Sequence, residues 1–279
     1  MKKMVKASFI NGQYLKPEEA SVKINDLGLL RGFSIFDFCR AKHGRPIFLK
    51  DHLQRFRQSA QSLGLPFSYS DAELMAITAE LGNRTKAETY GIRFLLTGGY
   101  SSDGFSQGEP NLIILTEEFT SSSSSSEAVK LMSHEFLREL PEIKTTNYIT
   151  AIMLQKNCES VNAYDILYKY NGKVLELTRS NFFLVKGNTL ITASNNVLKG
   201  ITRKAVIKIA MGKFEVEERD VYWEELLEAD EAFLTSTGKR IIQVAQVDDI
   251  SIGKRGKSEV SQWLSKELNA LDEVGNLNV

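Results

Sequence analysis

The sequence predicts an α+β protein built from two parts, on three observations. Helical periodicity is grouped between runs of strand-like residues, which is typical of α+β proteins. Asn-Gly dipeptides, which are typical of tight hairpins, occur in both halves. Serine occupies every position from 121 to 126, and such a run cannot pack a core. The sequence therefore predicts a first domain at 1–118, a Ser-rich linker at 119–126 and a second domain at 127–279.

The first half carries local signals for strands, then helices, then strands. Asn11-Gly12 lies inside a strand-like stretch and predicts a hairpin turn. Asp51 precedes apolar residues at helical spacing and is expected to cap that helix. The expected elements are strands at 7–14, 33–41 and 46–49, helices at 51–63 and 71–81 that end before Gly64 and Gly82, and strands at 90–96 and 112–115.

The second half is also mixed. Asn171-Gly172 gives the strongest hairpin signal in the chain, and Gly187-Asn188 joins a second strand pair. Ile149, Ile152 and Met153 are apolar positions of an expected amphipathic helix at 147–157. The expected elements are strands at 129–132, 164–170, 173–177, 181–185, 189–191, 231–235 and 240–247, and helices at 147–157, 202–211 and 260–271.

Composition excludes several classes of protein. The 279 residues contain 35 basic and 35 acidic side chains and no long basic run, so no nucleic-acid partner is expected. Two cysteines and three histidines lack metal-ligand or disulfide spacing, so no metal site is expected. No apolar stretch follows Lys2 and Lys3, so no signal peptide is expected, and no apolar run approaches the roughly 20 residues of a membrane span, so we expect a cytoplasmic protein.

Four segments of the second half carry side chains suited to chemistry. Lys144 lies just before a helix, and Glu176 follows the strong hairpin. Gly200-Ile201-Thr202 opens a helix whose first N–H groups can bind an anion, and the 235–238 segment ends a strand with hydroxyls and a glycine. A lysine amine, a carboxylate and an anion-binding helix start are the parts that pyridoxal phosphate (PLP) requires.

Six strings resemble those of the class IV aminotransferases, in the family's order and over nearly the whole chain. Any one string is weak evidence, but six in order are strong. They are Asp26–Gly32, His52–Phe56, Ile143–Tyr148, Glu176 with Asn181 five residues later, Asn195–Arg203 and Ala229–Thr237.

The resemblance implies fold type IV: a smaller N-terminal α/β domain and a larger C-terminal domain with a β-barrel-like sheet, with PLP at the domain interface. Relatives are homodimers that build each pocket from both subunits, so a homodimer is expected. The implied roles are Lys144 as the Schiff-base lysine, Glu176 on the pyridine nitrogen, Arg55, Ile201, Thr202 and Thr237 on the phosphate, Leu198 on the ring face, Tyr148 on the ring hydroxyl and Arg93 on a substrate carboxylate. Without the resemblance, Arg55 reads as an exposed helix residue, Arg93 as a strand-edge salt bridge, and Leu198 and Tyr148 as core.

The chain departs from the family pattern at three places. Ser34 stands for a glycine and Asp37 for a glutamate in the strand that borders the substrate pocket in relatives. The stretch 95–100 lacks the arginine-x-histidine carboxylate trap of D-amino-acid aminotransferases. Lys239-Arg240 is unusually basic, and Lys239 is a hypothetical second anion contact.

Three functions stay open at this point. The first is transfer of an amino group between a branched-chain or other apolar L-amino acid and a 2-oxo acid. The alternative within the same fold is a 4-amino-4-deoxychorismate lyase, which eliminates pyruvate with the same lysine. The third is a non-catalytic PLP-binding homologue.

Overall fold

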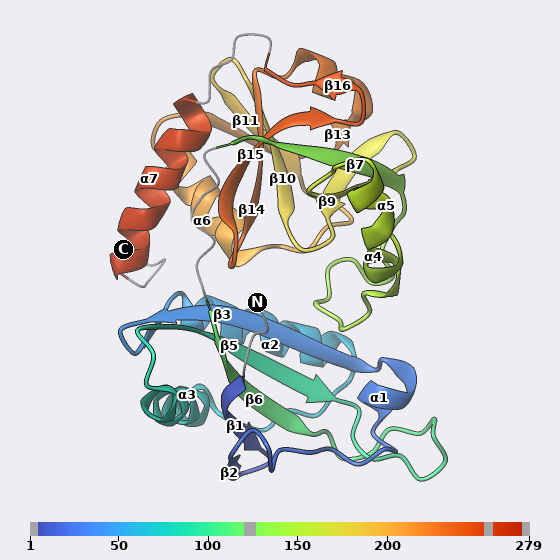
Figure 1. The fold of residues 1–279 in the computed structure, drawn as a ribbon, viewed down its shortest axis with the longest axis vertical. Helices are drawn as coiled ribbons and strands as arrows, with labels where there is room; N and C mark the ends of the chain where they lie inside the picture. The colour runs from blue at the N-terminus through green and yellow to red at the C-terminus, as the bar shows by residue number, and fades with distance from the viewer. Residues whose placement is uncertain (1–4, 120–126, 254–258, 275–279) are drawn as a thin grey trace. The chain divides into compact units, whose positions relative to one another are not determined.

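A computed structural model describes residues 5–119, 127–253 and 259–274 (Figure 1). The predicted serine linker lies outside the described residues, except for Phe119. The described chain forms two compact units: residues 5–119 with 143–147, and residues 127–142 with 148–253 and 259–274. The Lys144 segment thus belongs to the first unit, although the sequence assigned it to the second domain. The predicted boundaries at 118 and 127 stay a prediction.

The first unit is an antiparallel sheet with two long helices packed on it. Helices α2 (Leu49–Ser62) and α3 (Asp71–Thr85) bury Leu53, Phe56 and Leu74 against Ile92 and Phe94 of the sheet. The strands, in the order in which they pair, are β2 (Gln13–Leu15), β1 (Val5–Ile10), β6 (Leu112–Glu118), β5 (Thr89–Thr97), β3 (Ser34–Lys42) and β4 (Arg45–Pro46).

Turn chemistry explains where elements of the first unit begin and end. Asn11 and Gly12 both have positive φ, 46° and 91°, so the hairpin predicted there is confirmed. Asp26 caps α1 (Leu27–Arg31) by accepting the Gly28 N–H at 2.7 Å. Gly32 ends this helix in the left-handed region, at φ 66°.

Two helix boundaries expected from the sequence were wrong. The first long helix starts at Leu49 after Phe48, so Asp51 lies in its first turn rather than at its cap. The second continues to Thr85, with Gly82 inside it. A Cβ on Gly82 would lie 2.3 Å from the Tyr90 hydroxyl, so the glycine provides room for a side chain from β5.

The second unit is organised around a closed ring of strands. β9 pairs back onto β10 through Glu176 opposite Asn181, which closes the path β10, β14, β15, β7, β8 and β9. This ring confirms the expected barrel-like sheet. The strands, in pairing order, are β12 (Glu215–Arg219), β11 (Thr189–Ala193), β10 (Asn181–Lys186), β14 (Glu231–Ser236), β15 (Arg240–Val247), β7 (Val129–Glu135), β8 (Asp165–Tyr170), β9 (Lys173–Leu177) and β13 (Val221–Tyr222), with β16 (Ile250–Ser251) beside β15.

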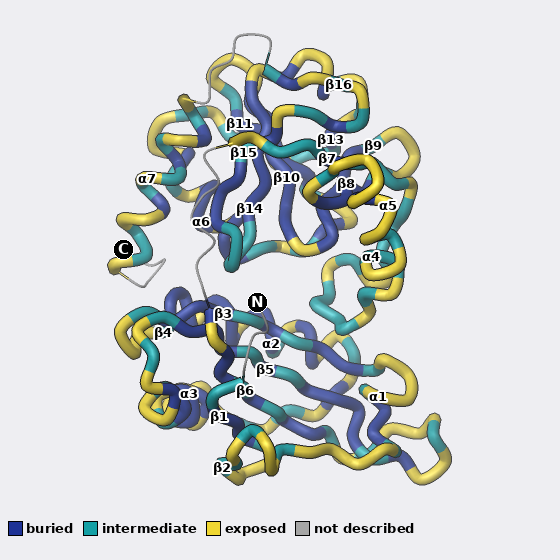
Figure 2. Tube along the Cα trace, in the orientation of Figure 1, coloured by how far each residue is buried: buried dark blue, intermediate teal, exposed yellow. Residues whose placement is uncertain are grey.

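The strands of the ring are mostly buried. Figure 2 shows buried residues along β10, β14 and β15, and every residue of β10 except Lys186 is buried. Helices α6 (Ile201–Ala210) and α7 (Glu259–Val274) lie side by side against β14 and β15 (Figure 1). The hairpin at Asn171-Gly172 is confirmed, and both residues have positive φ.

The single helix expected at 147–157 was wrong. The segment is split into α4 (Ile149–Met153) and α5 (Gln155–Ser160), which meet at Leu154. The apolar side chains of Ile149, Ile152 and Met153 form an exposed patch on α4.

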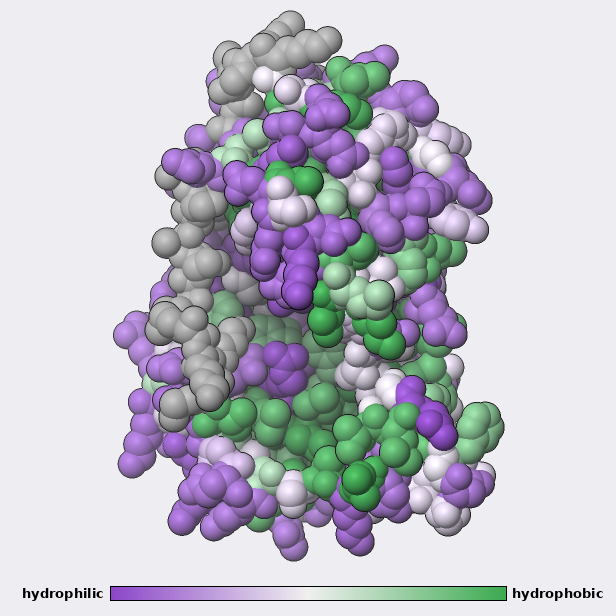
Figure 3. All heavy atoms as spheres, turned by 45° about the vertical axis from the view of Figure 1, so that its right-hand side comes forward, coloured by the Kyte–Doolittle hydropathy of each residue, from purple (hydrophilic) through white to green (hydrophobic). Residues whose placement is uncertain are grey.

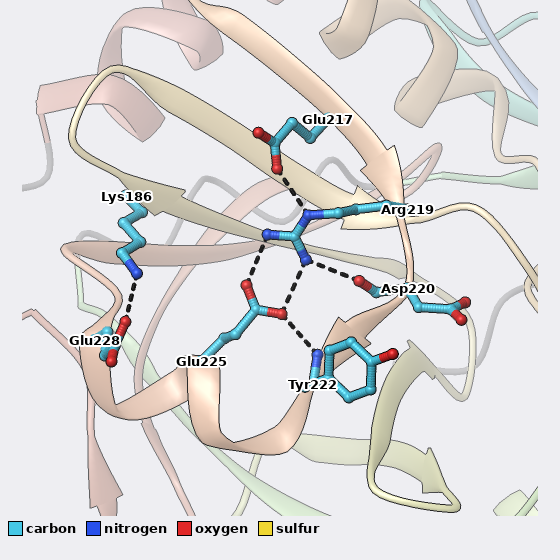
Figure 4. A network of polar contacts seen from close by, with 7 residues as sticks. All are labelled: Lys186, Glu217, Arg219, Asp220, Tyr222, Glu225 and Glu228. Carbon is cyan, nitrogen blue, oxygen red and sulfur yellow. Dashed lines mark hydrogen bonds and ion pairs between the residues drawn. The ribbon is translucent and has the colours of Figure 1, made fainter.

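A polar network fixes the outer edge of the second unit (Figure 4). Arg219, at the end of β12, donates to Glu217 at 2.7 Å and to both carboxylate oxygens of Glu225. Glu225 belongs to the 3-10 helix η1 (Trp223–Glu228) and also accepts the N–H of Tyr222. These bonds raise the pKa of Arg219 and join β12 to η1, with Lys186–Glu228 as a neighbouring pair.

Candidate active site

Lys144 is held against the start of β3 in the first unit, away from the end of β3 that pairs with β4. Its carbonyl accepts the Phe36 N–H at 2.9 Å, and the Thr146 N–H donates to the Ser34 carbonyl at 3.1 Å. Ile35 and Thr145 form an isolated antiparallel bridge between these two contacts. The Lys144 Nζ lies 4.5 Å from the centre of the Phe36 ring, so the backbone is fixed while the amine lies over an aromatic face.

Ser34, one of the departures from the family pattern, contacts the lysine segment directly. Its hydroxyl lies 2.5 Å from the Thr146 hydroxyl, two residues beyond Lys144. A glycine at this position has no hydroxyl to make that bond. The departure therefore adds a contact to the lysine segment.

Asp37, the second departure, organises a buried charge cluster with Arg55. The carboxylate accepts two bonds from the Arg55 guanidinium, at 2.7 and 2.8 Å, and one from His52 Nδ1 at 2.7 Å. Burial alone would raise the pKa of Asp37, but the neighbouring Arg55 and His52 outweigh it and hold the pKa well below its ordinary value. Burial also lowers the pKa of His52. Arg55 is therefore an oriented, buried cation rather than an exposed helix residue.

Arg93 is already paired in this structure. Its Nη2 donates to Glu117 on β6 at 2.9 Å, and its guanidinium lies 5.6 Å from the ring centre of Phe36 and 5.3 Å from that of Phe38. The arginine, both phenylalanines and Glu117 thus share one face of the sheet. Its role as a carboxylate ligand stays a prediction.

Glu176 is held at one end of the ring in the second unit. Arg138 Nε donates to Glu176 Oε1 at 2.8 Å, and the Leu198 N–H donates to Oε2 at 3.1 Å. Asn181 donates to the Leu198 carbonyl at 2.8 Å and lies 3.5 Å from Oε2. Glu176 is only 5% exposed, and its buried carboxylate is held by Arg138, Asn181 and the Leu198 N–H.

The start of α6 lies beside this carboxylate. Gly200 is the N-cap, and a glycine has no side chain with which to cap the helix. A Cβ on Gly200 would lie 2.1 Å from Asn181 Oδ1, so only glycine lets the helix start approach β10 this closely. Ile201 and Thr202, at the first two helical positions, offer their N–H groups there.

The turn from β14 to β15 lies at the same end of the ring. Thr235 pairs with Asn181 across β10 and β14, so Ser236 and Thr237 follow directly beyond that pair. The buried Thr235 hydroxyl has no hydrogen-bond partner among the described residues. A helix start, hydroxyls and a buried carboxylate at one end of the barrel fit the phosphate and pyridine ends of PLP.

Each unit holds its own share of the predicted site residues. The second unit gathers Glu176, Leu198, Ile201 and Thr202, with Thr237 in the adjoining turn. Lys144, Arg55 and Arg93 belong to the first unit. Tyr148 precedes α4 and its carbonyl accepts the Ile152 N–H, so its contact with a ring hydroxyl stays a prediction.

The family model described as "Amino-transferase class IV" matches residues 34–247, which is well over half of the chain. The chain belongs to this family. Class IV aminotransferases use PLP as their cofactor, so this enzyme is a PLP-dependent aminotransferase by family.

The names of similar proteins agree with this assignment. A protein of Methanocaldococcus jannaschii, provisionally named a branched-chain-amino-acid aminotransferase, is 29% identical over 93% of this chain and 94% of its own. The D-alanine aminotransferase of Bacillus licheniformis is 28% identical over 87% of this chain and 89% of its own. These relatives differ in the substrates that their names state.

Solved structures confirm the fold of this class IV aminotransferase. The branched-chain amino acid aminotransferase of Escherichia coli superposes with a TM-score of 0.88 at 24% identity, over 99% of this chain and 97% of that one. A Legionella pneumophila protein, provisionally named a 4-amino-4-deoxychorismate lyase, gives 0.83 at 28% identity, over 90% and 96%. The expected α+β, fold type IV architecture is therefore confirmed.

Neither a membrane span nor a metal cluster occurs in the described part of the chain. No helix in the described ranges is long and apolar enough to cross a membrane. No group of three or more His, Cys, Asp or Glu side chains there could hold a metal ion.

Sequence reasoning missed the partners that hold the site residues of this class IV aminotransferase. Arg138 holds the Glu176 carboxylate in place. In the sequence, Arg138 stands out only as a charged residue in the segment that leads to Lys144. Glu117, which pairs with Arg93, lies on β6. The strand expected there ended at residue 115, two residues before Glu117. Lys239, for which an anion contact was a hypothesis, donates to Asp165 at 2.7 Å, and Arg240 pairs with Asp272 on α7.

Proposed function

We propose that this enzyme transfers the amino group of a branched-chain or other apolar L-amino acid to a 2-oxo acid, with Lys144 as the lysine that binds PLP. The observation that carries the substrate class is the Arg93–Glu117 pair. A carboxylate 2.9 Å from the guanidinium already neutralises it, beside two phenylalanine rings. A face of this kind favours an apolar side chain over a second carboxylate.

Lys144 is proposed to carry the proton. When bound, PLP supplies the ring that takes up the charge left as the α-proton departs. The Lys144 amine would take the proton from the substrate Cα, hold it, and return it as the amino group is transferred. The fixed backbone at Ser34 and Phe36 keeps this amine in place for both transfers.

Glu176 and the phosphate residues are proposed to orient the cofactor. Arg138, Asn181 and the Leu198 N–H hold the Glu176 carboxylate, which would keep a proton on the pyridine nitrogen. The N–H groups of Ile201 and Thr202 would bind phosphate oxygens at the start of α6. Arg55 and the Thr237 hydroxyl are proposed to bind the same phosphate, Leu198 to pack on the ring face and Tyr148 to bond the ring hydroxyl.

Borohydride reduction of the PLP-loaded protein, followed by peptide mapping, tests the lysine assignment. The label is expected on Lys144, absent from a Lys144→Ala variant and retained in the exposed-lysine control Lys156→Ala. A label on any other lysine would overturn the assignment. A panel of amino acids in half-reactions then tests the chemistry, because conversion to the pyridoxamine form by none of them would reject transamination.

The second candidate is lyase activity, favoured by the 28% identity to the Legionella protein named for 4-amino-4-deoxychorismate. Lys144 would serve both reactions, so the lysine alone does not separate them. Release of pyruvate from 4-amino-4-deoxychorismate without any oxo-acid acceptor would favour the lyase. We place D-amino acids behind L-amino acids, because residues 95–100 contain neither arginine nor histidine.

We also infer a homodimer. In the first unit Ile24, Leu29 and Phe105 are 80%, 63% and 82% exposed, around α1 and the loop that follows β5. Figure 3 shows hydrophobic side chains gathered on the side of this unit that faces the viewer, in the lower part of the picture. Analytical ultracentrifugation is expected to give a mass near twice the 31.4 kDa of the chain, and a monomer at micromolar concentration would contradict it.

A further inference from the structure

One buried carboxylate at the site end of the ring bonds to two separate segments. Asp165, the first residue of β8, is 7% exposed. Its Oδ2 accepts from Lys239 Nζ at 2.7 Å, and its Oδ1 accepts from the Thr178 hydroxyl at 2.6 Å. The Ile166 N–H also donates to Oδ1, at 2.8 Å. Both carboxylate oxygens are therefore committed.

The two segments joined by Asp165 are the ones that carry proposed cofactor contacts. Thr178 lies two residues after Glu176. Lys239 lies two residues after Thr237, in the turn between β14 and β15. In the sheet, β7 lies between β15 and β8, so the Lys239–Asp165 pair joins segments of two strands that do not pair with each other.

Lys239 is built into the fold rather than displayed in solvent. Its side chain is 18% exposed, and its Nζ lies 4.6 Å from the centre of the Tyr164 ring. Its backbone N–H donates to Ser236 Oγ at 3.1 Å, across the turn. Burial lowers the pKa of Lys239, and the neighbouring Asp165 charge offsets only part of that effect. A buried ion pair of this kind adds little net stability, so a geometric role accounts for it better.

We propose that Asp165 is a positioning residue for cofactor binding: through Lys239 and Thr178 it fixes the Thr237 turn relative to the strand end that carries Glu176. The phosphate contact and the pyridine contact of PLP are then held at a set separation before the cofactor arrives. This inference rests on the proposed PLP-binding roles of Thr237 and Glu176.

The rival role for Lys239 is direct binding of an anion, and one substitution separates the two. Asp165→Asn would free the Lys239 amine, so a direct anion contact would bind PLP as well as before or more tightly. In a positioning role, Asp165→Asn loosens the turn and weakens PLP binding, as Lys239→Met does. Because the two residues act as one unit, the double variant should be no weaker than either single variant.

The dissociation constant of PLP, measured on the full chain by absorbance and fluorescence titration, is the first readout. Lys239→Met and Asp165→Asn are expected to weaken binding about tenfold, as for loss of one charge-assisted hydrogen bond. Lys239→Arg should restore most of the affinity. Lys173→Met removes another lysine–aspartate pair of this unit, with Asp220 at 2.6 Å, and should leave PLP affinity unchanged.

The second readout is the rate of hydrogen exchange in the 235–240 turn. If the other variants fold poorly, Thr178→Val is a milder substitution that removes only the Thr178 bond to Asp165. Faster exchange in this turn, with the wild-type rate elsewhere, supports the positioning role. Wild-type affinity and exchange in Lys239→Met and Asp165→Asn, or tighter binding by Asp165→Asn, would overturn it. A wild-type protein that binds no PLP would instead overturn the proposed function on which the inference rests.

Discussion

The hydroxyl of Ser34 lies 2.5 Å from the hydroxyl of Thr146, so the strand that borders Lys144 is tied to the lysine segment by side chains as well as by backbone. The backbone bonds at Phe36 and Thr146 set the path of the segment. The hydroxyl pair restricts the end of the segment beyond Lys144. Ser34 is 3% exposed and Thr146 is half-buried, so the bond is partly shielded from competing water.

Replacing Ser34 with alanine should lower the rate of the half-reaction about fivefold, since one neutral hydrogen bond contributes about 1 kcal/mol. Stopped-flow absorbance of the PLP-loaded enzyme measures this rate. Ser8→Ala is a matched control, because Ser8 donates to the Leu15 carbonyl at 2.9 Å in a hairpin remote from Lys144. It should cost similar stability and leave the rate unchanged; an equal rate loss in both variants would contradict a specific role for Ser34.

Asp37→Asn should destabilise the protein by about 3 kcal/mol or more at pH 7, because it leaves the buried Arg55 without its counter-charge. The folded-state pKa of Asp37 is depressed, so its stabilisation is fully present above the unfolded pKa of about 3.9 and is lost as pH falls below it. The stability gap between wild type and variant, measured by urea unfolding, should be constant above about pH 5 and shrink at lower pH.

The control for Asp37 is Asp71→Asn, which breaks the pair with Arg57 on the same helix as Arg55. That pair is substantially exposed, so the loss should stay below about 1 kcal/mol. Equal losses of stability in the two variants would show that the buried Asp37 cluster stabilises the protein no more than an exposed ion pair does.

Local signals in the sequence predicted local structure well. Asn11-Gly12 and Asn171-Gly172 predicted their hairpins because positive φ is a property of the dipeptide itself. Gly82 misled for the opposite reason. Its lack of a side chain accommodates the hydroxyl of Tyr90, eight residues away in sequence and on another element, which no local rule detects.

In the candidate site, too, local signals were readable from the sequence and long-range contacts were not. Lys144 and Glu176 are recognisable because each lies in a contiguous string. Their partners are not, since Arg138 meets Glu176 from 38 residues away and Lys239 meets Asp165 from 74. A single sequence gives no pairing at such distances, so the sequence offered an anion contact for Lys239 only as a hypothesis and could not show its pair with Asp165.

Glu117→Gln should shift substrate preference toward dicarboxylates, because it removes the charge that neutralises Arg93. The ratio of kcat/KM for a dicarboxylic over an apolar amino acid is expected to rise about tenfold, the effect of one charge-assisted pair. Arg93→Leu in the same background should abolish the gain. An unchanged ratio in Glu117→Gln would show that Arg93 does not face the substrate.

Gly200→Ala tests whether the start of α6 must touch β10. The φ of Gly200 is −64°, which alanine adopts freely, so the obstacle is the 2.1 Å approach of a Cβ to Asn181 Oδ1. Relief of that clash has to move either the helix start or Asn181, and both flank the proposed phosphate and Glu176 contacts. PLP is therefore expected to bind at least about tenfold more weakly in a titration, the loss of one good hydrogen bond to a charged group.

Gly212→Ala, just beyond the other end of α6, is the control: its Cβ would lie 3.6 Å from the Ile209 carbonyl, an ordinary contact, so this variant should bind PLP normally. Wild-type affinity in Gly200→Ala would mean that the cofactor phosphate does not depend on this helix start.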